Sequence, residues 1–272
     1  AMTRVQHAAA LDARYAAALD PPLGALPGPE ATTFALWAPT AQFVAICVFD
    51  DGDSPARSTR TLDRDVASGV WSARLPEASL GSYYVYLVDV FVPGLGLVRN
   101  RVTDPYALGL GADGRRAMVV DLDDARFKPE DWDAHPRPPA PENNVDMVLY
   151  ELHVRDFSRD DASVPPQHRG RYLGFAQRDS LGMRHLRELA EAGLTDVHLL
   201  PVYDISTIPE TGCVTPVVMG PPDSEQQQAT IAAIKHEDCF NWGYDPQHFT
   251  VPEGSYASDA HDGAVRIREL RR

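Results

Sequence analysis

Short runs of β-branched and aromatic residues fill the first half of the chain and are separated by clusters of Gly, Asp and Pro. Such clusters occur at residues 50–53 and 93–96. Short apolar runs at regular intervals, divided by turn residues, are typical of an antiparallel β-sandwich. The pattern predicts a sandwich domain over residues 31–124, with strands at residues 34–37, 43–49, 70–75, 83–92 and 118–122.

Before the predicted sandwich, the apolar residues follow a helical spacing. Apolar residues recur at steps of three and four between residues 4 and 19, and Pro21 and Pro22 follow. This spacing predicts an amphipathic helix that ends at the prolines. We therefore expect residues 1–30 to form an N-terminal helical arm.

Five prolines between residues 125 and 144 mark a boundary, because proline cannot donate to a sheet or continue a helix. Beyond this linker, residues 145–154 and 196–200 are predicted to be buried strands. A helix is expected between them, over residues 183–192, with Gly193 at its end. Strand, helix and strand in this order favour a parallel sheet covered by helices.

The remaining sequence holds one long polar stretch and one helical pattern. Residues 203–240 have no strong period, so we expect a loop, and a loop of this length is usually functional or mobile. Residues 263–272 carry apolar positions at helical spacing and are predicted to open another helix.

Composition excludes several classes of protein. The 272 residues are 44% hydrophobic and carry a net charge of −14, which disfavours binding to nucleic acid or to an anionic membrane. No apolar run is long enough to span a membrane, and the first residues do not form a secretion signal. We expect a cytoplasmic protein, or a secreted one if a leader preceded Ala1.

The three cysteines do not predict a metal site. Cys47, Cys213 and Cys239 are odd in number and form no Cys-x-x-Cys pair. Cys213 and Cys239 flank a predicted loop and could pair in an oxidising compartment, but free thiols are the expected state.

Long sequence strings carry a family resemblance. Asn-Trp-Gly-Tyr-Asp-Pro at 241–246, Val-Pro-Glu-Gly-Ser-Tyr-Ala at 251–257 and Tyr-Glu-Leu-His-Val-Arg-Asp-Phe-Ser at 150–158 resemble the type I pullulanases and limit dextrinases. These are the starch-debranching branch of the α-amylase superfamily. Phe-Ala-Leu-Trp-Ala-Pro-Thr-Ala at 34–41 and Thr-Asp-Pro-Tyr-Ala at 103–107 resemble a family 48 carbohydrate-binding module.

The resemblance implies an immunoglobulin-like module followed by the first β/α units of a (β/α)8 TIM barrel, over residues 145–272, with the barrel incomplete. It implies retaining hydrolysis of α-1,6 linkages in pullulan, amylopectin or limit dextrins. Two carboxylates roughly 5 Å apart perform this reaction. In the family both lie further along the barrel, so we expect them after Arg272 and expect no catalytic residue in this chain.

The resemblance also implies partners. An α-glucan is the expected ligand, and the missing C-terminal half of the barrel is a further expected partner. No cofactor is needed for the chemistry, no catalytic metal is expected, and the family allows a structural calcium ion.

Tyr244 is the substrate-binding residue that the resemblance favours, with its ring beneath the sugar whose bond is cleaved. A flat aromatic ring suits the apolar face of glucose. The alternative is a core tyrosine in a tight turn. Trp242 lines the cleft or packs behind it, and Asp245 is expected to support the turn. His153 and Asp156 are expected to be hydrogen-bonded supports rather than catalysts.

The sandwich aromatics are expected to be core residues rather than a glucan platform, because aromatics on strands more often pack across strands. They are Trp37, Trp71, Tyr83, Tyr84 and Tyr86. Two alternatives to a debranching enzyme stay open. One is a non-catalytic α-glucan-binding module, and the other is an isoamylase or glycogen debranching enzyme, which the sequence at 155–158 disfavours.

Overall fold

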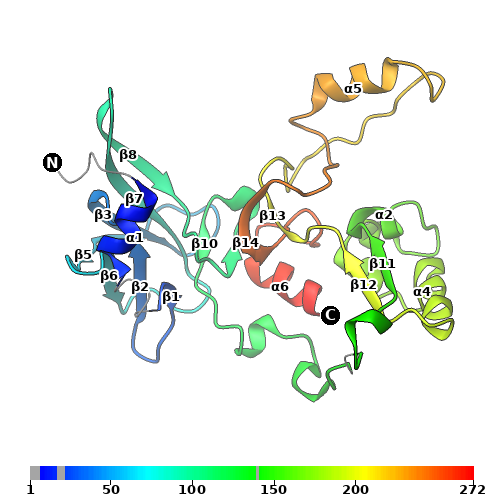
Figure 1. Ribbon diagram of the computed structural model, residues 1–272, viewed down its shortest axis with the longest axis horizontal. Helices are drawn as coiled ribbons and strands as arrows, with labels where there is room; N and C mark the ends of the chain where they lie inside the picture. The colour runs from blue at the N-terminus through cyan, green and yellow to red at the C-terminus, as the bar shows by residue number, and fades with distance from the viewer. Residues whose placement is uncertain (1–6, 17–21, 139–140) are drawn as a thin grey trace. The chain divides into compact units, whose positions relative to one another are not determined.

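A computed structural model describes residues 7–16, 22–138 and 141–272 (Figure 1). The chain divides into two compact units, residues 1–122 and 123–272. Within the described residues, no helix has both the length and the apolar character needed to cross a membrane.

The helix predicted for residues 4–19 is shorter than expected among the described residues. α1 covers Ala8–Arg14. Val5 and Leu19, which belong to the predicted pattern, lie outside the described residues. The predicted helical arm also contains a short strand, because residues 24–26 pair with the sandwich.

The first unit is a β-sandwich of two antiparallel sheets. One sheet has the order β1-β2-β6-β5, and the other has the order β4-β3-β7-β10-β9, with β8 also paired to β7. The strands are β1 Gly24–Leu26, β2 Thr32–Trp37, β3 Ala41–Phe49, β4 Ser58–Thr61, β5 Asp63–Arg64, β6 Val70–Leu75, β7 Tyr83–Val92, β8 Gly96–Val102, β9 Gly109–Leu110 and β10 Ala117–Met118. A short 3-10 turn, η3, spans Ala112–Gly114.

The predicted strands are found, with differences at their ends. β6 and β7 have the predicted bounds, while β2 and β3 each begin two residues earlier than predicted. The strand predicted at 118–122 is reduced to β10. β8 was not predicted, because it alternates with Arg and Asn and is largely exposed.

Aromatic side chains fill the sandwich core. Tyr84 is fully buried between Phe34 and Tyr86, with ring centroids 4.8 and 5.7 Å away. Its hydroxyl donates to Asp104 Oδ2 at 2.7 Å, which satisfies the polar group. Tyr83, Tyr86 and Trp71 are buried as well, which confirms the predicted core role. Trp37 is half-buried, and its indole donates to the Ser68 carbonyl.

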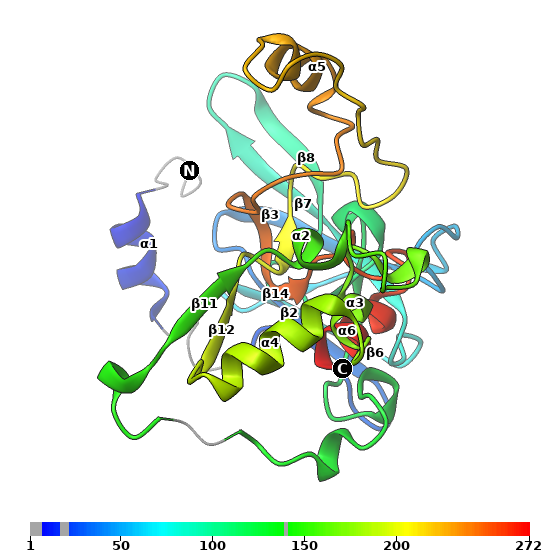
Figure 2. The ribbon, with the colours of Figure 1, turned by 90° about the vertical axis from the view of Figure 1, so that its right-hand side faces the viewer.

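The second unit combines two small sheets with short helices (Figure 2). β11 and β12 are parallel, whereas β13 and β14 are antiparallel. The elements are η4 Ala125–Phe127, η5 Trp132–Ala134, η6 Asn144–Asp146, β11 Leu149–Leu152, α2 Val154–Ser158, η7 Pro166–His168, α3 Tyr172–Phe175, α4 Leu181–Glu191, β12 Asp196–Leu199, β13 Tyr203–Ile205, α5 Gln226–Ile234, β14 Pro246–Pro252 and α6 Gly263–Arg271.

The predicted β-α-β order is present, but the predicted burial of its first strand is wrong. β11 covers only residues 149–152, and Val148 and Leu149 are 51% and 59% exposed. The sheet that β11 forms with β12 has only two strands, so neither strand has a neighbour on its other edge. Lateral neighbours that would bury this apolar run are therefore absent from the described residues.

α4 lies beside β12 and ends as the sequence predicts (Figure 2). The Ser180 hydroxyl caps its start by accepting from the Met183 amide at 3.3 Å. Gly193 follows its end with φ +112°, a left-handed conformation that suits glycine. Ala190 near the end of α4 is exposed, because the sheet beside the helix has only two strands among the described residues.

The segment 203–240 is more ordered than the predicted loop. It begins with β13 and contains α5, which lies at the tip of an excursion in both ribbon views. A disulfide joins Cys213 to Cys239, so the expectation of free thiols is wrong. The paired backbone around Val214 and Asp238 brings the two Cα atoms to 4.9 Å, a distance within the range that a disulfide requires.

Candidate functional site

The turn at residues 241–246 presents two aromatic side chains to solvent. Trp242 is 58% exposed and Tyr244 is 69% exposed. Gly243 stands between them with φ +89°, and a Cβ there would lie 2.8 Å from the Pro201 side chain. Only glycine fits this backbone without strain. The alternative of a core tyrosine at 244 does not apply to the described structure.

Polar contacts brace the 241–246 turn from within and from the segment after β13. The Gly243 amide donates to Asn241 Oδ1 at 2.8 Å, and the Asn241 side-chain amide donates to the Thr207 hydroxyl. That hydroxyl in turn donates to Asp245 Oδ2, and the Ser206 amide donates to the Asp245 carbonyl at 3.0 Å. Asp245 thus makes the contacts of a turn support, whereas a role in sugar binding stays a prediction.

Aromatic rings enclose His153 at the end of β11. The ring is 6% exposed, and the centroids of Phe240, Trp242 and Tyr256 lie 5.5, 6.4 and 5.8 Å from its own. Asp156 is exposed instead and pairs with Arg155 at 3.1 Å. Both residues therefore have structural partners, and His153 also contacts the turn that carries Trp242.

A second aromatic pair was missed by the sequence reasoning. Phe249 on β14 is 74% exposed, and its ring meets Tyr203 of β13 edge-on at 5.3 Å. A phenylalanine in a short strand is normally expected in the core. The pairing of β14 with β13 leaves the Phe249 side chain on the exposed face, which the sequence alone does not indicate.

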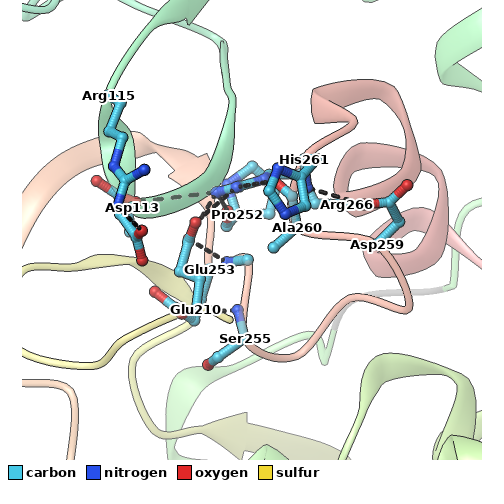
Figure 3. Close-up of polar contacts among 12 residues, drawn as sticks. Asp113, Arg115, Glu210, Pro252, Glu253, Ser255, Asp259, Ala260, His261 and Arg266 are labelled. Atoms are coloured by element: carbon cyan, nitrogen blue, oxygen red, sulfur yellow. Dashed lines mark hydrogen bonds and ion pairs between the residues drawn. The ribbon is translucent and has the colours of Figure 1, made fainter. Parts of the chain in front are cut away.

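Buried charges gather where β13, β14 and α6 meet (Figure 3). The guanidinium of Arg266 donates to both carboxylate oxygens of Glu210, each at 2.9 Å, and to the carbonyls of Pro252 and Ala260. A Cβ at Gly254 would approach Glu210 Oε1 to 2.2 Å, so the close packing requires glycine there.

Two further carboxylates complete this ion network. Glu253 accepts from the Ile205 and Ser255 amides at 2.7 and 2.8 Å, and Asp204 accepts from His248 Nδ1 at 2.7 Å. We call Asp204, Glu210, His248, Glu253 and Arg266 the buried ion network. Sequence reasoning did not predict this network. The spacing of Gly263, Arg266 and Ile267 on one buried face of α6 is the signal that could have indicated Arg266.

Burial shifts the pKa values in this network. Burial, together with the nearby Glu210 charge, raises the pKa of Glu253 from 4.5 to about 7. For Arg266, burial alone would lower the pKa, but the adjacent carboxylates, Glu210 first, outweigh it and raise the pKa above its ordinary value. Of these two groups, Glu253 is therefore the one whose pKa lies near neutral pH.

The carboxylates of this network can be tested as a metal site. Oxygens of Asp204, Glu210 and Glu253 lie within 4.8 Å of one another. The Arg266 guanidinium already supplies a positive charge there, bonded to Glu210 and 3.8 Å from Asp204. Both oxygens of Glu253 accept hydrogen bonds from backbone amides. These carboxylates therefore suit an internal ion network better than a site for calcium, which binds six to eight oxygens. A structural calcium ion stays a prediction.

Comparison with known proteins agrees with the resemblance. Residues 22–107 match the family described as carbohydrate-binding module 48 (isoamylase N-terminal domain). Pullulanase 1, chloroplastic, of Arabidopsis thaliana is 42% identical over 93% of this chain and 27% of its own length. Pullulanase of Klebsiella pneumoniae is 35% identical over 99% of this chain and 28% of its own length. The chain therefore spans under a third of these relatives.

Solved structures give the same result. The crystal structure of PulA from Klebsiella oxytoca matches with a TM-score of 0.87 and 34% identity, over 96% of this chain and 28% of that one. Klebsiella pneumoniae pullulanase complexed with maltotriose matches with a TM-score of 0.86 and 33% identity, over 96% of this chain and 29% of that one. The chain is therefore similar to pullulanases over most of its length and includes a match to carbohydrate-binding module 48, which fits the N-terminal portion of a pullulanase.

Proposed function

We propose that this chain is part of a starch-debranching glycoside hydrolase that cleaves α-1,6 linkages in pullulan, amylopectin or limit dextrins with retention. One observation carries the proposal: Trp242 and Tyr244 stand exposed on a turn that a glycine and several hydrogen bonds hold rigid. Exposed aromatic rings on a rigid support suit stacking against glucose. The maltotriose complex of the Klebsiella pneumoniae relative supports an α-glucan as the ligand class.

The β11-α4-β12 order supports a second part of the proposal, that the second unit begins a (β/α)8 barrel. Parallel strands joined by a helix are the repeating unit of that fold. The exposed Val148, Leu149 and Val197 would be covered if further parallel strands completed the sheet. The missing half of the barrel is then the partner of this surface.

The arrangement of acidic residues supports placing both catalytic carboxylates outside this chain. A retaining enzyme needs two carboxylates roughly 5 Å apart that face the sugar. Asp204, Glu210 and Glu253 are close enough, but they are buried and bonded to Arg266, His248 or backbone amides. A sugar cannot reach them in this arrangement, and we propose no cofactor for the chemistry.

The second candidate is a non-catalytic glucan-binding module. It is favoured by the match of residues 22–107 to carbohydrate-binding module 48. The sandwich aromatics weaken it, because Trp71, Tyr83, Tyr84 and Tyr86 are buried in the core. An isoamylase is less well supported, since isoamylase SU1 of Zea mays is 29% identical over 72% of this chain. The pullulanase of Arabidopsis thaliana exceeds both values.

Release of reducing ends from pullulan tests the proposal. The 272-residue chain should release none, whereas a longer protein that contains this chain and the rest of the barrel should release maltotriose units as the α-anomer. NMR of the fresh products reports the anomer. Turnover by the purified 272-residue chain would refute the placement of the carboxylates. A longer protein that binds β-cyclodextrin without cleaving pullulan would support the binding-module candidate instead.

A further inference from the structure

We propose that His153 is a positioning residue: its neutral Nε2–H tautomer holds the Asn241 carbonyl and so fixes the turn that presents Trp242 and Tyr244. The inference rests on the proposed glucan function for the role of the two rings. The geometry of the histidine itself is independent of any ligand.

The partners of the two ring nitrogens determine the tautomer. Nδ1 lies 3.2 Å from the Arg155 amide nitrogen, and Nε2 lies 3.0 Å from the Asn241 carbonyl oxygen. An amide N–H can only donate, so Nδ1 must carry a lone pair. A carbonyl can only accept, so Nε2 must carry the proton. Both contacts therefore require the same neutral form of the ring.

The surroundings of the ring keep it in one orientation. The rings of Phe240, Trp242 and Tyr256 pack against it, Trp242 and Tyr256 edge-on. The Tyr256 hydroxyl oxygen lies 3.2 Å from Nε2 and shares the same N–H. A 180° flip of the ring would place carbon atoms against both hydrogen-bonding partners, so the packing holds the ring plane and the hydrogen bonds select one of its two flip states.

The Asn241 carbonyl oxygen links the fixed His153 ring to the turn that carries Trp242 and Tyr244. That carbonyl belongs to the peptide unit whose nitrogen begins Trp242, so holding it restricts the rotation that aims the indole. The Asn241 side chain is fixed separately, because its oxygen accepts from Gly243 and its amide donates to Thr207. The hydrogen bond from His153 therefore holds the peptide plane between Asn241 and Trp242, which the side-chain contacts of Asn241 do not do.

The other ring nitrogen, Nδ1, has a separate role in the stability of α2. Nδ1 caps the first turn of α2 by accepting from the Arg155 amide, and loss of a cap destabilises a helix whatever the turn does. The two functions are thus on two different atoms of one ring. Substitutions that keep one atom and lose the other can separate them.

The matched pair His153→Gln and His153→Asn makes this separation. The glutamine amide reaches the Nε2 position and can donate to Asn241, while the asparagine side chain reaches only the Nδ1 position and can accept from Arg155. The 272-residue chain is labelled with ¹⁵N on indole nitrogen, and the Trp242 signal is identified by its loss in Trp242→Phe. The signals of Trp71 and Trp132 report whether each unit remains folded.

We expect His153→Gln to leave the Trp242 indole signal in place and His153→Asn to shift or broaden it. In β-cyclodextrin titrations, His153→Asn should weaken binding about tenfold, the equivalent of about 1.4 kcal/mol, while His153→Gln stays near wild type. A second wild-type sample with ¹⁵N-labelled histidine should show the His153 proton on Nε2, the His153 signals being identified by their loss in His153→Asn. An unchanged Trp242 signal in His153→Asn, equal effects of both variants, or a proton on Nδ1 would overturn the inference.

The two proposals fail in different ways. If wild type binds no β-cyclodextrin but the Trp242 signal moves only in His153→Asn, the positioning role of His153 is supported and the glucan function is refuted. If β-cyclodextrin binds and both variants bind as wild type does, the glucan function survives and the role of His153 is wrong.

Discussion

Glu253→Gln should change how the stability of this protein depends on pH. The side chain is fully buried, and its two oxygens accept one backbone amide each, from Ile205 and Ser255. Burial first, and the Glu210 charge second, raise the pKa of Glu253 from 4.5 to about 7. Glutamine has nearly the same shape and cannot ionise, but its NH2 group cannot accept a hydrogen bond, so one of the two backbone amides loses its acceptor at every pH.

The sign and size follow from linkage between protonation and folding. Between pH 4.5 and about 7 the folded state holds a proton on Glu253 that the unfolded state releases. This contribution to stability is fully present below pH 4.5 and is lost as the pH rises through about 7. The difference between these pKa values corresponds to about 3 kcal/mol, of which about 2–3 kcal/mol falls between pH 5 and pH 8. The variant cannot ionise at this position and loses none of it.

Urea unfolding of wild type and Glu253→Gln at pH 5, 6, 7 and 8 measures this difference. At pH 5 the variant should be less stable than wild type by about 1–3 kcal/mol, because one buried backbone amide has lost its acceptor and wild type carries the proton there. By pH 8 the variant should have gained about 2–3 kcal/mol relative to wild type. Glu142→Gln, at an exposed position, controls for the loss of one surface charge. The reasoning would be refuted if the stability of Glu253→Gln relative to wild type stayed constant with pH or fell as the pH rises.

Three further predictions concern the ion network, the aromatic turn and the disulfide. Arg266→Met should cost about 3–5 kcal/mol in thermal or urea unfolding, because Glu210 is left buried without its partner, whereas Arg268→Met on the same helix should cost about 1 kcal/mol or less; equal losses would contradict this. In a longer, active protein, Tyr244→Ala should lower kcat/KM on pullulan about 10²-fold, with a smaller loss for Tyr244→Phe; a lowered Tm with unchanged kcat/KM would contradict the substrate-binding role. Cys213→Ser should speed limited proteolysis of residues 214–238, since the bridge closes a separation of 26 residues; identical cleavage rates before and after substitution would count against this.

Features that depend on neighbouring residues along the chain were predictable. β6 and β7 have the expected bounds because β-branched and aromatic runs end at turn residues. α4 ends where glycine permits a left-handed backbone, and Gly243 makes the 241–246 turn for the same reason. The family resemblance likewise rests on short contiguous strings, and the comparisons confirm it.

Burial was less predictable, because it depends on what covers an element. The apolar run at 145–154 looks like an interior strand, yet Leu149 is exposed on a sheet of two strands. Phe249 was not singled out and is also exposed. An apolar side chain indicates which surface can be covered, whereas only the arrangement of the neighbouring strands determines whether it is covered.

The amino-acid sequence by itself determined the strands β2, β3, β6 and β7, the glycine turn at 241–246 and the resemblance to the pullulanases. The tertiary structure alone decided that Glu210, Glu253 and Arg266 meet in one buried ion network, that Cys213 bonds to Cys239, and that one ring nitrogen of His153 reaches the Asn241 carbonyl. The physical reason is range. Backbone preferences act over a few residues, but the charge, redox state and tautomer of a buried group depend on partners that closure of long loops brings into contact.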